Sequence, residues 1–100
     1  SERYGNSTYT LPGLVASASY TVRLHFAELF QTATGMRTFN VAINGTTVLS
    51  NFDIFAATGA AFKATLRDFT ATATSSGQIV VTLTTVKDNA TIEGIEIIRP

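Results

Sequence analysis

The sequence predicts an all-β protein, an antiparallel β-sandwich built from two sheets. Apolar and polar residues alternate with a period of two along several segments, which is the pattern of strands that bury one face. Turn residues separate these segments at intervals of about ten residues, and no segment shows the period of a long helix. We therefore expect a sandwich of the jelly-roll or immunoglobulin-like kind.

Two strands and a hairpin turn are predicted in the first half of the chain. Residues 19–26 and 38–43 carry apolar side chains at every second position, so each predicts a strand with one buried face. The dipeptide Asn44-Gly45 follows the second strand, and both of its residues accept the positive φ of a type I′ turn. The chain is therefore expected to return through residues 46–49.

The second half alternates in the same way over residues 68–74 and 78–84, and the Ser75-Ser76-Gly77 turn between them predicts a second hairpin. A last strand is expected over residues 91–98, with a bulge or close backbone approach at Gly94. Residues 51–64 follow neither pattern and are interpreted as a strand end and a long surface loop. The side chains expected inside are Tyr20, Val22, Leu24, Phe26, Phe39, Val41, Ile43, Phe69, Ile79, Val81, Leu83, Ile95 and Ile97.

Composition excludes several classes of function. The 100 residues fit one domain. Seven Lys and Arg residues balance seven Asp and Glu residues, so nothing attracts nucleic acid or an anionic membrane surface. No apolar run approaches the roughly 18 residues that cross a bilayer, so we expect no membrane insertion. The absence of cysteine excludes disulfides, thiolate zinc sites and a cysteine nucleophile.

Catalysis and metal binding find little support among the polar residues. His25 is the only histidine, but it falls on the polar face of a strand beside Arg23, which favours a structural role over a catalytic base. The acidic residues show no spacing typical of a glycosidase pair. Asp53 and Asp88 stand alone among neutral neighbours, whereas calcium needs several oxygen ligands. We expect no enzyme activity, no metal and no cofactor.

The aromatic residues are the informative class, because sugar-binding modules stack pyranose rings on exposed aromatic rings. Phe26, Phe39 and Phe69 follow the apolar alternation and are assigned to the core. Tyr4 and Phe30 lie outside that alternation. Each is either a stacking platform for a sugar or an anchor packed on the rim of the sandwich, and the residues alone leave both alternatives open.

Three Asn-X-Ser/Thr sequons, at Asn6, Asn44 and Asn89, would mark surface loops if the chain came from a secretory eukaryote. Chance explains most of them in a chain so rich in Ser and Thr. Asn44 already has a structural reason, since it belongs to the predicted hairpin turn.

Several segments taken in order give the chain a family resemblance. They are Glu2-Arg3-Tyr4-Gly5, His25-Phe26-Ala27-Glu28, Arg37-Thr38-Phe39-Asn40-Val41 with Asn44-Gly45, Asn51-Phe52-Asp53-Ile54 and Asp88-Asn89. Their order and spacing resemble a malectin-type domain over nearly the whole chain. The resemblance implies a jelly-roll sandwich of the galactose-binding-like kind and a lectin role without catalysis.

The resemblance also implies where sugar would bind. Positions that hold sugar in malectin fall on Tyr4 and Asp88, and malectin's Tyr-Phe pair falls on Phe30 and Gln31; Arg3 and Gln31 are the polar neighbours. The chain departs from the family here, because Phe30 lacks the hydroxyl and Gln31 lacks the ring. One stacking surface is lost, so malectin's own diglucose specificity does not carry over.

We therefore expect a carbohydrate-binding module for oligosaccharides or polysaccharides of glucose or galactose type, located outside the cell or in the periplasm. The competing expectation is a structural or protein-interaction module of a surface protein with a degenerate sugar site. Because the family domain begins well before Ser1, we also expect the 1–100 domain to be truncated or part of a larger protein. An open sheet edge would then be covered by self-association or by a partner segment.

Overall fold

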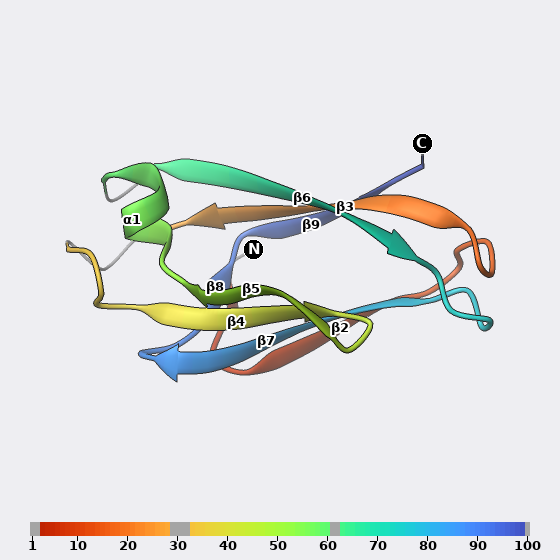
Figure 1. Cartoon of the computed structure of the whole chain (residues 1–100), viewed down its shortest axis with the longest axis horizontal. Coiled ribbons are helices and arrows are strands. Elements are labelled where there is room, and N and C mark those ends of the chain that lie inside the picture. Colours follow the sequence, from red (N-terminus) through yellow and green to blue (C-terminus); the bar gives the residue numbers. More distant parts are fainter. Residues whose placement is uncertain (1–2, 29–32, 61–62, 100) are drawn as a thin grey trace.

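The protein is a two-layered β-sandwich, shown in Figure 1 from a computed structural model that describes residues 3–28, 33–60 and 63–99. The fold class predicted from the alternation is confirmed. One short helix is described, α1 (Ile54–Thr58). The strands are β1 (Arg3–Tyr4), β2 (Ser7–Leu11), β3 (Ser19–Ala27), β4 (Thr38–Ile43), β5 (Thr46–Phe52), β6 (Ala64–Thr72), β7 (Ile79–Lys87), β8 (Thr91–Ile92) and β9 (Gly94–Ile98).

The two layers are antiparallel sheets with the strand orders β2-β7-β4-β5 and β6-β3-β9. The short strands β1 and β8 pair with each other beside them. In Figure 1, β3 and β7 both end at the left, where β4 begins and α1 lies. We call this the loop end, made of residues 28, 33–37, 53–59 and 85–90.

The core lies between the sheets and contains most of the residues expected from sequence, together with four that were not expected, Ile54, Ala73, Ala90 and Ile92. Ten of the expected residues are at most 5% exposed: Tyr20, Val22, Leu24, Phe26, Phe39, Val41, Ile43, Ile79, Val81 and Leu83. The other three, Phe69, Ile95 and Ile97, are partly buried and pack against the core. Three phenyl rings pack together near the loop end, with centroid separations of 4.9 Å for Phe26–Phe52 and 5.8 Å for Phe39 with each of these two rings.

The Asn44-Gly45 hairpin is present, with φ of 50° and 81°. The returning strand β5 extends beyond the predicted residues 46–49 to Phe52. The Asn44 side chain also joins the two sheets, because its Nδ2 donates to the Thr72 carbonyl oxygen (2.9 Å) and its Oδ1 accepts from the Val80 amide (2.8 Å). Asn44 therefore stabilises the fold in two ways, through its turn conformation and through these two hydrogen bonds.

The predicted second hairpin is wrong. Strand β6 pairs with β3, whereas β7 pairs with β2 and β4 in the other sheet. The turn itself exists, since the Gly77 amide donates to the Thr74 carbonyl oxygen at 2.9 Å, but it carries the chain from one layer to the other. Alternation identifies the buried face of a strand and leaves its pairing partner undetermined.

The long loop predicted for residues 51–64 is also corrected. Its first residues end β5 as expected, but α1 follows at Ile54. The Asp53 side chain caps the helix by accepting from the Ala56 amide (3.1 Å), and Gly59 ends it with φ of 78°. A helix of five residues is too short to show an apolar period.

The last predicted strand is interrupted as expected, but at Glu93, which separates β8 from β9. The Glu93 amide donates to the His25 carbonyl oxygen at 2.8 Å. Neither alternative expected at Gly94 is found, because Gly94 pairs with His25 in regular register and a Cβ there would lie 3.9 Å from the His25 side chain, which is ordinary contact. Strands β1 and β2 were not predicted: β1 has only two residues, and β2 fully buries none of its five side chains.

Candidate functional site

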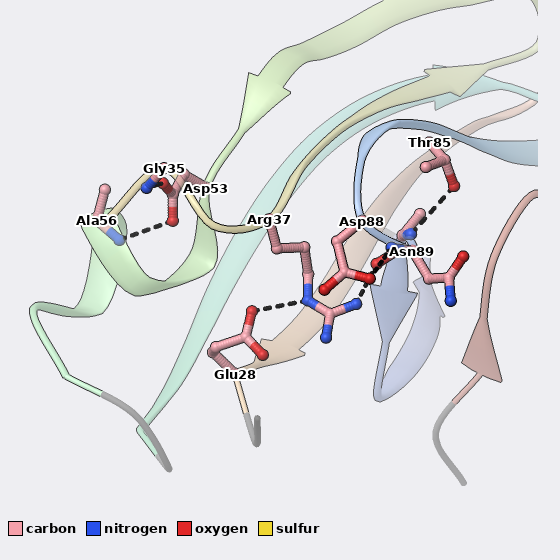
Figure 2. Close-up of polar contacts among 9 residues, drawn as sticks. Glu28, Gly35, Arg37, Asp53, Ala56, Thr85, Asp88 and Asn89 are labelled. Atoms are coloured by element: carbon pink, nitrogen blue, oxygen red, sulfur yellow. Dashed lines mark hydrogen bonds and ion pairs between the residues drawn. The ribbon is translucent and has the colours of Figure 1, made fainter. Parts of the chain in front are cut away.

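A buried ion pair lies at the centre of the loop end. Arg37 Nε donates to Glu28 Oε1 at 2.8 Å, and the two side chains are 4% and 1% exposed. Glu28 directly follows β3, and Arg37 directly precedes β4. Figure 2 shows the two side chains pointing toward each other across the end of the sandwich. Each charge therefore compensates the other where water is largely excluded.

The same guanidinium holds the turn between β7 and β8. Arg37 Nη1 donates to the carbonyl oxygen of Asn89 (Figure 2). Within the turn, the Asn89 amide donates to Asp88 Oδ1 (2.8 Å), and the Ala90 amide donates to Thr85 Oγ1 (3.2 Å). Asp88 has φ of 56°, in the left-handed region that non-glycine residues rarely occupy. Several contacts thus fix this turn while the Asp88 side chain remains exposed.

The backbone of β1 runs beside this turn. Tyr4 is opposite Thr91 and Arg3 is opposite Ile92 in the β1–β8 pairing, and the Gly5 amide donates to the Ala90 carbonyl oxygen at 2.8 Å. The structure thus brings the backbone of Arg3 and Tyr4 close to the Asp88 turn. Phe30 and Gln31 lie outside the described residues, although they follow Glu28 closely in the sequence.

A second carboxylate organises the other half of the loop end. Asp53 Oδ1 accepts from the Ala56 amide in α1, and Asp53 Oδ2 accepts from the Gly35 amide (Figure 2). The side chain thereby ties the segment that leads to Arg37 to the start of the helix. Its oxygens act as acceptors for backbone amides, which gives Asp53 a structural role.

His25 lies where the alternation placed it, on the outer face of the β6-β3-β9 sheet. Its Nε2 hydrogen-bonds the Glu96 carboxylate, and beside it Arg23 Nε and Nη2 bind the two carboxylate oxygens of Asp68 at 2.9 Å and 3.1 Å. The Arg23 hydrogen bond lowers the pKa of Asp68 below its usual value. These four side chains form a partly exposed row of two hydrogen-bonded pairs, which fits the structural role expected for His25.

A groove of about 320 Å³ lies far from the loop end, beside the β4–β5 turn. Its lining consists of Ile43, Asn44, Thr46, Val48, Thr70, Ala71 and Thr72. None of these is aromatic, and the Asn44 amide is occupied in joining the sheets. The groove therefore lacks the stacking surface typical of a sugar site.

Sequence reasoning did not single out Glu28 and Arg37, although a signal was present. Glu28 continues the buried alternation that runs through Leu24 and Phe26, and Arg37 precedes Phe39 in the same register. Two oppositely charged residues that both continue the buried alternation, at the same end of two strands, predict a buried pair.

Among the described residues, none belongs to a helix long and apolar enough to cross a membrane.

The architecture defines a β-sandwich domain of the jelly-roll class, with several loops gathered at one end. Residues 1–95 match the Malectin domain family, and the chain belongs to that family. The family resemblance seen in the sequence is thus confirmed.

Relatives of this chain are much longer proteins. It is 34% identical over 103 residues to the Kinesin-like protein KIN-14E of Oryza sativa subsp. japonica, covering 95% of this chain and 9% of that protein. It is 35% identical over 92 residues to Receptor-like protein 4 of Arabidopsis thaliana, covering 90% of this chain and 14% of that protein. The chain thus spans a small part of each relative's length.

Solved structures with this fold include the ANX2 ectodomain from Arabidopsis thaliana. It superposes with a TM-score of 0.86 at 21% identity, over 96% of this chain and 31% of that one. A second is the structure of the plant peptide RALF23 in complex with FER and LLG2, with a TM-score of 0.81 at 22% identity, over 92% of this chain and 26% of that one. At such identities the likeness shows the shared fold.

Proposed function

We propose that this chain is a non-catalytic carbohydrate-binding module that takes glucose- or galactose-type glycans at its loop end. The observation that carries the proposal is the exposed carboxylate of Asp88, presented on a turn fixed by Arg37 and Thr85 next to the backbone of Tyr4. Carboxylates accept hydrogen bonds from sugar hydroxyls, and aromatic rings stack on the apolar faces of sugars. A carboxylate beside a ring is therefore the combination that such a site needs.

In this proposal, Tyr4 and Phe30 provide stacking surfaces, Asp88 accepts hydrogen bonds from sugar hydroxyls, and Arg3 and Gln31 add polar contacts. Gln31 replaces a ring with an amide, so it offers hydrogen bonds where the family pattern offers stacking. We expect weak binding, because a lost aromatic contact costs about 0.5–1.5 kcal/mol. That loss is up to roughly tenfold in the dissociation constant.

The proposal is tested by nuclear magnetic resonance titration with four disaccharides. Maltose, cellobiose, melibiose and lactose present α- and β-linked glucose and galactose. The bound sugar should shift the amides of residues 4–5 and 88–91 first. Asp88→Asn should weaken binding about tenfold to a hundredfold, since hydrogen bonds to charged groups contribute about 1.5–3 kcal/mol.

The matched control is Thr70→Ala, which alters the groove beside the β4–β5 turn and should leave binding unchanged. Shifts confined to residues 43–48 and 70–72 would place the site in that groove. They would contradict the assignment of sugar binding to the loop end.

A second candidate function is protein interaction. Two observations favour it, the Gln31 departure and the likeness to FER, which is solved in complex with the peptide RALF23 and with LLG2. In that case the loop end would bind a peptide or another protein. A glycan array distinguishes the two, since silence across all glycan classes at high protein concentration would favour interaction over sugar binding.

We further propose that the domain works outside the cell or in the periplasm, as part of a secreted or surface-attached protein. Its likeness to a receptor-like protein and to receptor ectodomains supports this location. Its role is binding without catalysis. The one histidine of the sequence bonds Glu96 on the outer face of a sheet, away from the proposed site.

A further inference from the structure

The buried Glu28–Arg37 pair sits beneath the proposed sugar site and contacts the turn that carries Asp88. We infer that this pair is a positioning element: it sets the conformation of the Asp88–Asn89 turn and thereby sugar affinity. This inference rests on the proposed function. It assigns a binding role to two residues that would touch no sugar themselves.

The first step is the orientation of the guanidinium. Glu28 Oε1 accepts from Arg37 Nε, so the carboxylate fixes one side of the planar group. A planar guanidinium held on one side directs its remaining N–H groups along fixed lines. Here Nη1 meets the carbonyl oxygen of Asn89, as Figure 2 shows. The carboxylate of Glu28 thus determines where the turn is held.

The second step is the strained backbone of the turn. Asp88 adopts φ of 56°, and a non-glycine residue stays in this region where surrounding contacts hold it. Hydrogen bonds to Asp88 and Thr85 form within the turn, whereas the bond from Arg37 comes from the other side of the sandwich end. Losing the Arg37 bond should let the peptide after Asp88 rotate, and the carboxylate would then no longer hold one direction.

The third step is that the turn held by Arg37 is joined to the neighbouring strand β1. Arg37 bonds Asn89, and the next residue, Ala90, accepts from the Gly5 amide beside Tyr4. A change in the pair should therefore affect the placement of both segments. Sugar binding needs their relative placement to be correct, because stacking and hydroxyl contacts must be made together.

The informative variant replaces both partners. Arg37→Met alone would remove the guanidinium that the buried Glu28 carboxylate pairs with, and breaking a buried ion pair by removing one side is strongly destabilising. The double variant Glu28→Gln with Arg37→Met removes both charges at similar side-chain volume, which buried pairs often tolerate. Arg37→Lys keeps the cation but not the planar fork, so it tests for partial rescue. The control is Arg23→Met with Asp68→Asn, an exposed ion pair on the outer face of a sheet.

Two readouts are needed on each folded variant. Isothermal titration calorimetry with maltose, cellobiose, melibiose and lactose gives affinity, and ¹⁵N relaxation gives the order parameters of the amides of residues 88–90. We expect the double variant to bind at least tenfold more weakly and to lose order at these amides. Arg37→Lys should recover part of both, and the control pair should match the wild type.

A folded double variant that binds within twofold of the wild type, with unchanged amide order, would overturn the inference. If the wild type binds none of the four sugars, the proposed function fails while the order parameters still decide the structural claim. Amides of residues 88–90 that stay as rigid in the double variant as in the wild type would then overturn it. A drop in their order would support a positioning role for whatever ligand the turn meets.

Discussion

Replacing Phe39 by alanine tests whether the three-ring cluster stabilises the sandwich as its packing indicates. Phe39 is fully buried on β4, and its ring lies 5.8 Å from the rings of Phe26 and Phe52, edge-on to the latter. The substitution would remove a phenyl group from the contact between the two sheets. It would leave a cavity that the flanking strands cannot close without losing register.

The expected loss follows from this geometry. Truncating a buried phenylalanine to alanine costs about 3–5 kcal/mol, and two favourable ring contacts place Phe39 toward the upper part of that range. A domain of this size has a total stability of about 5–15 kcal/mol. The variant should therefore lose a large share of its stability, and it should be visibly less stable at 37 °C.

Urea unfolding followed by circular dichroism measures the effect. The midpoint should fall while the slope m stays constant, because the surface exposed on unfolding hardly changes. Leu66→Ala is the matched control, since Leu66 is 47% exposed on β6 and should change stability by no more than about 0.5 kcal/mol. A loss below about 1 kcal/mol for Phe39→Ala would refute the assignment of this ring to the core.

Further predictions concern backbone strain, pH and the sheet edges. Gly77→Ala should cost several kcal/mol of stability in thermal unfolding: about 1–3 kcal/mol for its φ of 73°, and more because the new Cβ would lie well inside 3.0 Å of a backbone oxygen. Gly45→Ala is the control, since Gly45 has φ of 81° in open space and should cost only the roughly 1–3 kcal/mol of backbone strain. The hydrogen bond from Arg23 lowers the pKa of Asp68 in the folded state. The pair should therefore stabilise the fold at pH above about 3.9, the pKa of an unfolded aspartate, and this stabilisation should be lost as the pH falls through the lower pKa of the folded state. Asp68→Asn should therefore flatten the acid limb of a plot of Tm against pH, and an unaltered limb would argue against the pair. Within the described chain, β9 pairs with β3 alone and is therefore an open edge strand. We expect this edge to recruit a second copy or a partner segment. A monomer by sedimentation equilibrium at around 100 μM would contradict this expectation.

The alternation of side chains was sufficient to predict the fold class and most of the core, but not Ile54, Ala90 and Ile92, which lie outside the regular alternation of the strands. Val22 and Val41 could be assigned to the interior because a period of two leaves one choice of buried face. It could not show that β6 and β7 belong to different sheets, because pairing partners depend on contacts far apart in the sequence. It also could not show α1, whose evidence lies in its caps, Asp53 and Gly59, and not in a period.

The candidate site was predictable only through the family resemblance. The exposed position of Asp88 depends on a left-handed backbone angle, which no residue pattern around it specifies. The buried pair beneath it was predictable in principle, because Glu28 and Arg37 both stand in core register. It was overlooked because charged residues next to strand ends are usually exposed, and burial becomes plausible only when two strands bring opposite charges together.

The Glu28–Arg37 pair also limits the paths by which this sequence can evolve. Either residue mutated alone breaks this buried ion pair from one side, at a typical cost of about 3–5 kcal/mol, which is a large part of a small domain's stability. A lineage that replaces the pair with apolar residues must therefore cross a poorly folded intermediate or change both codons nearly together. Such a constraint predicts that in homologous sequences the two positions are kept as a pair or exchanged as a pair. A lineage that had made the exchange would be free to vary the turn next to Asp88.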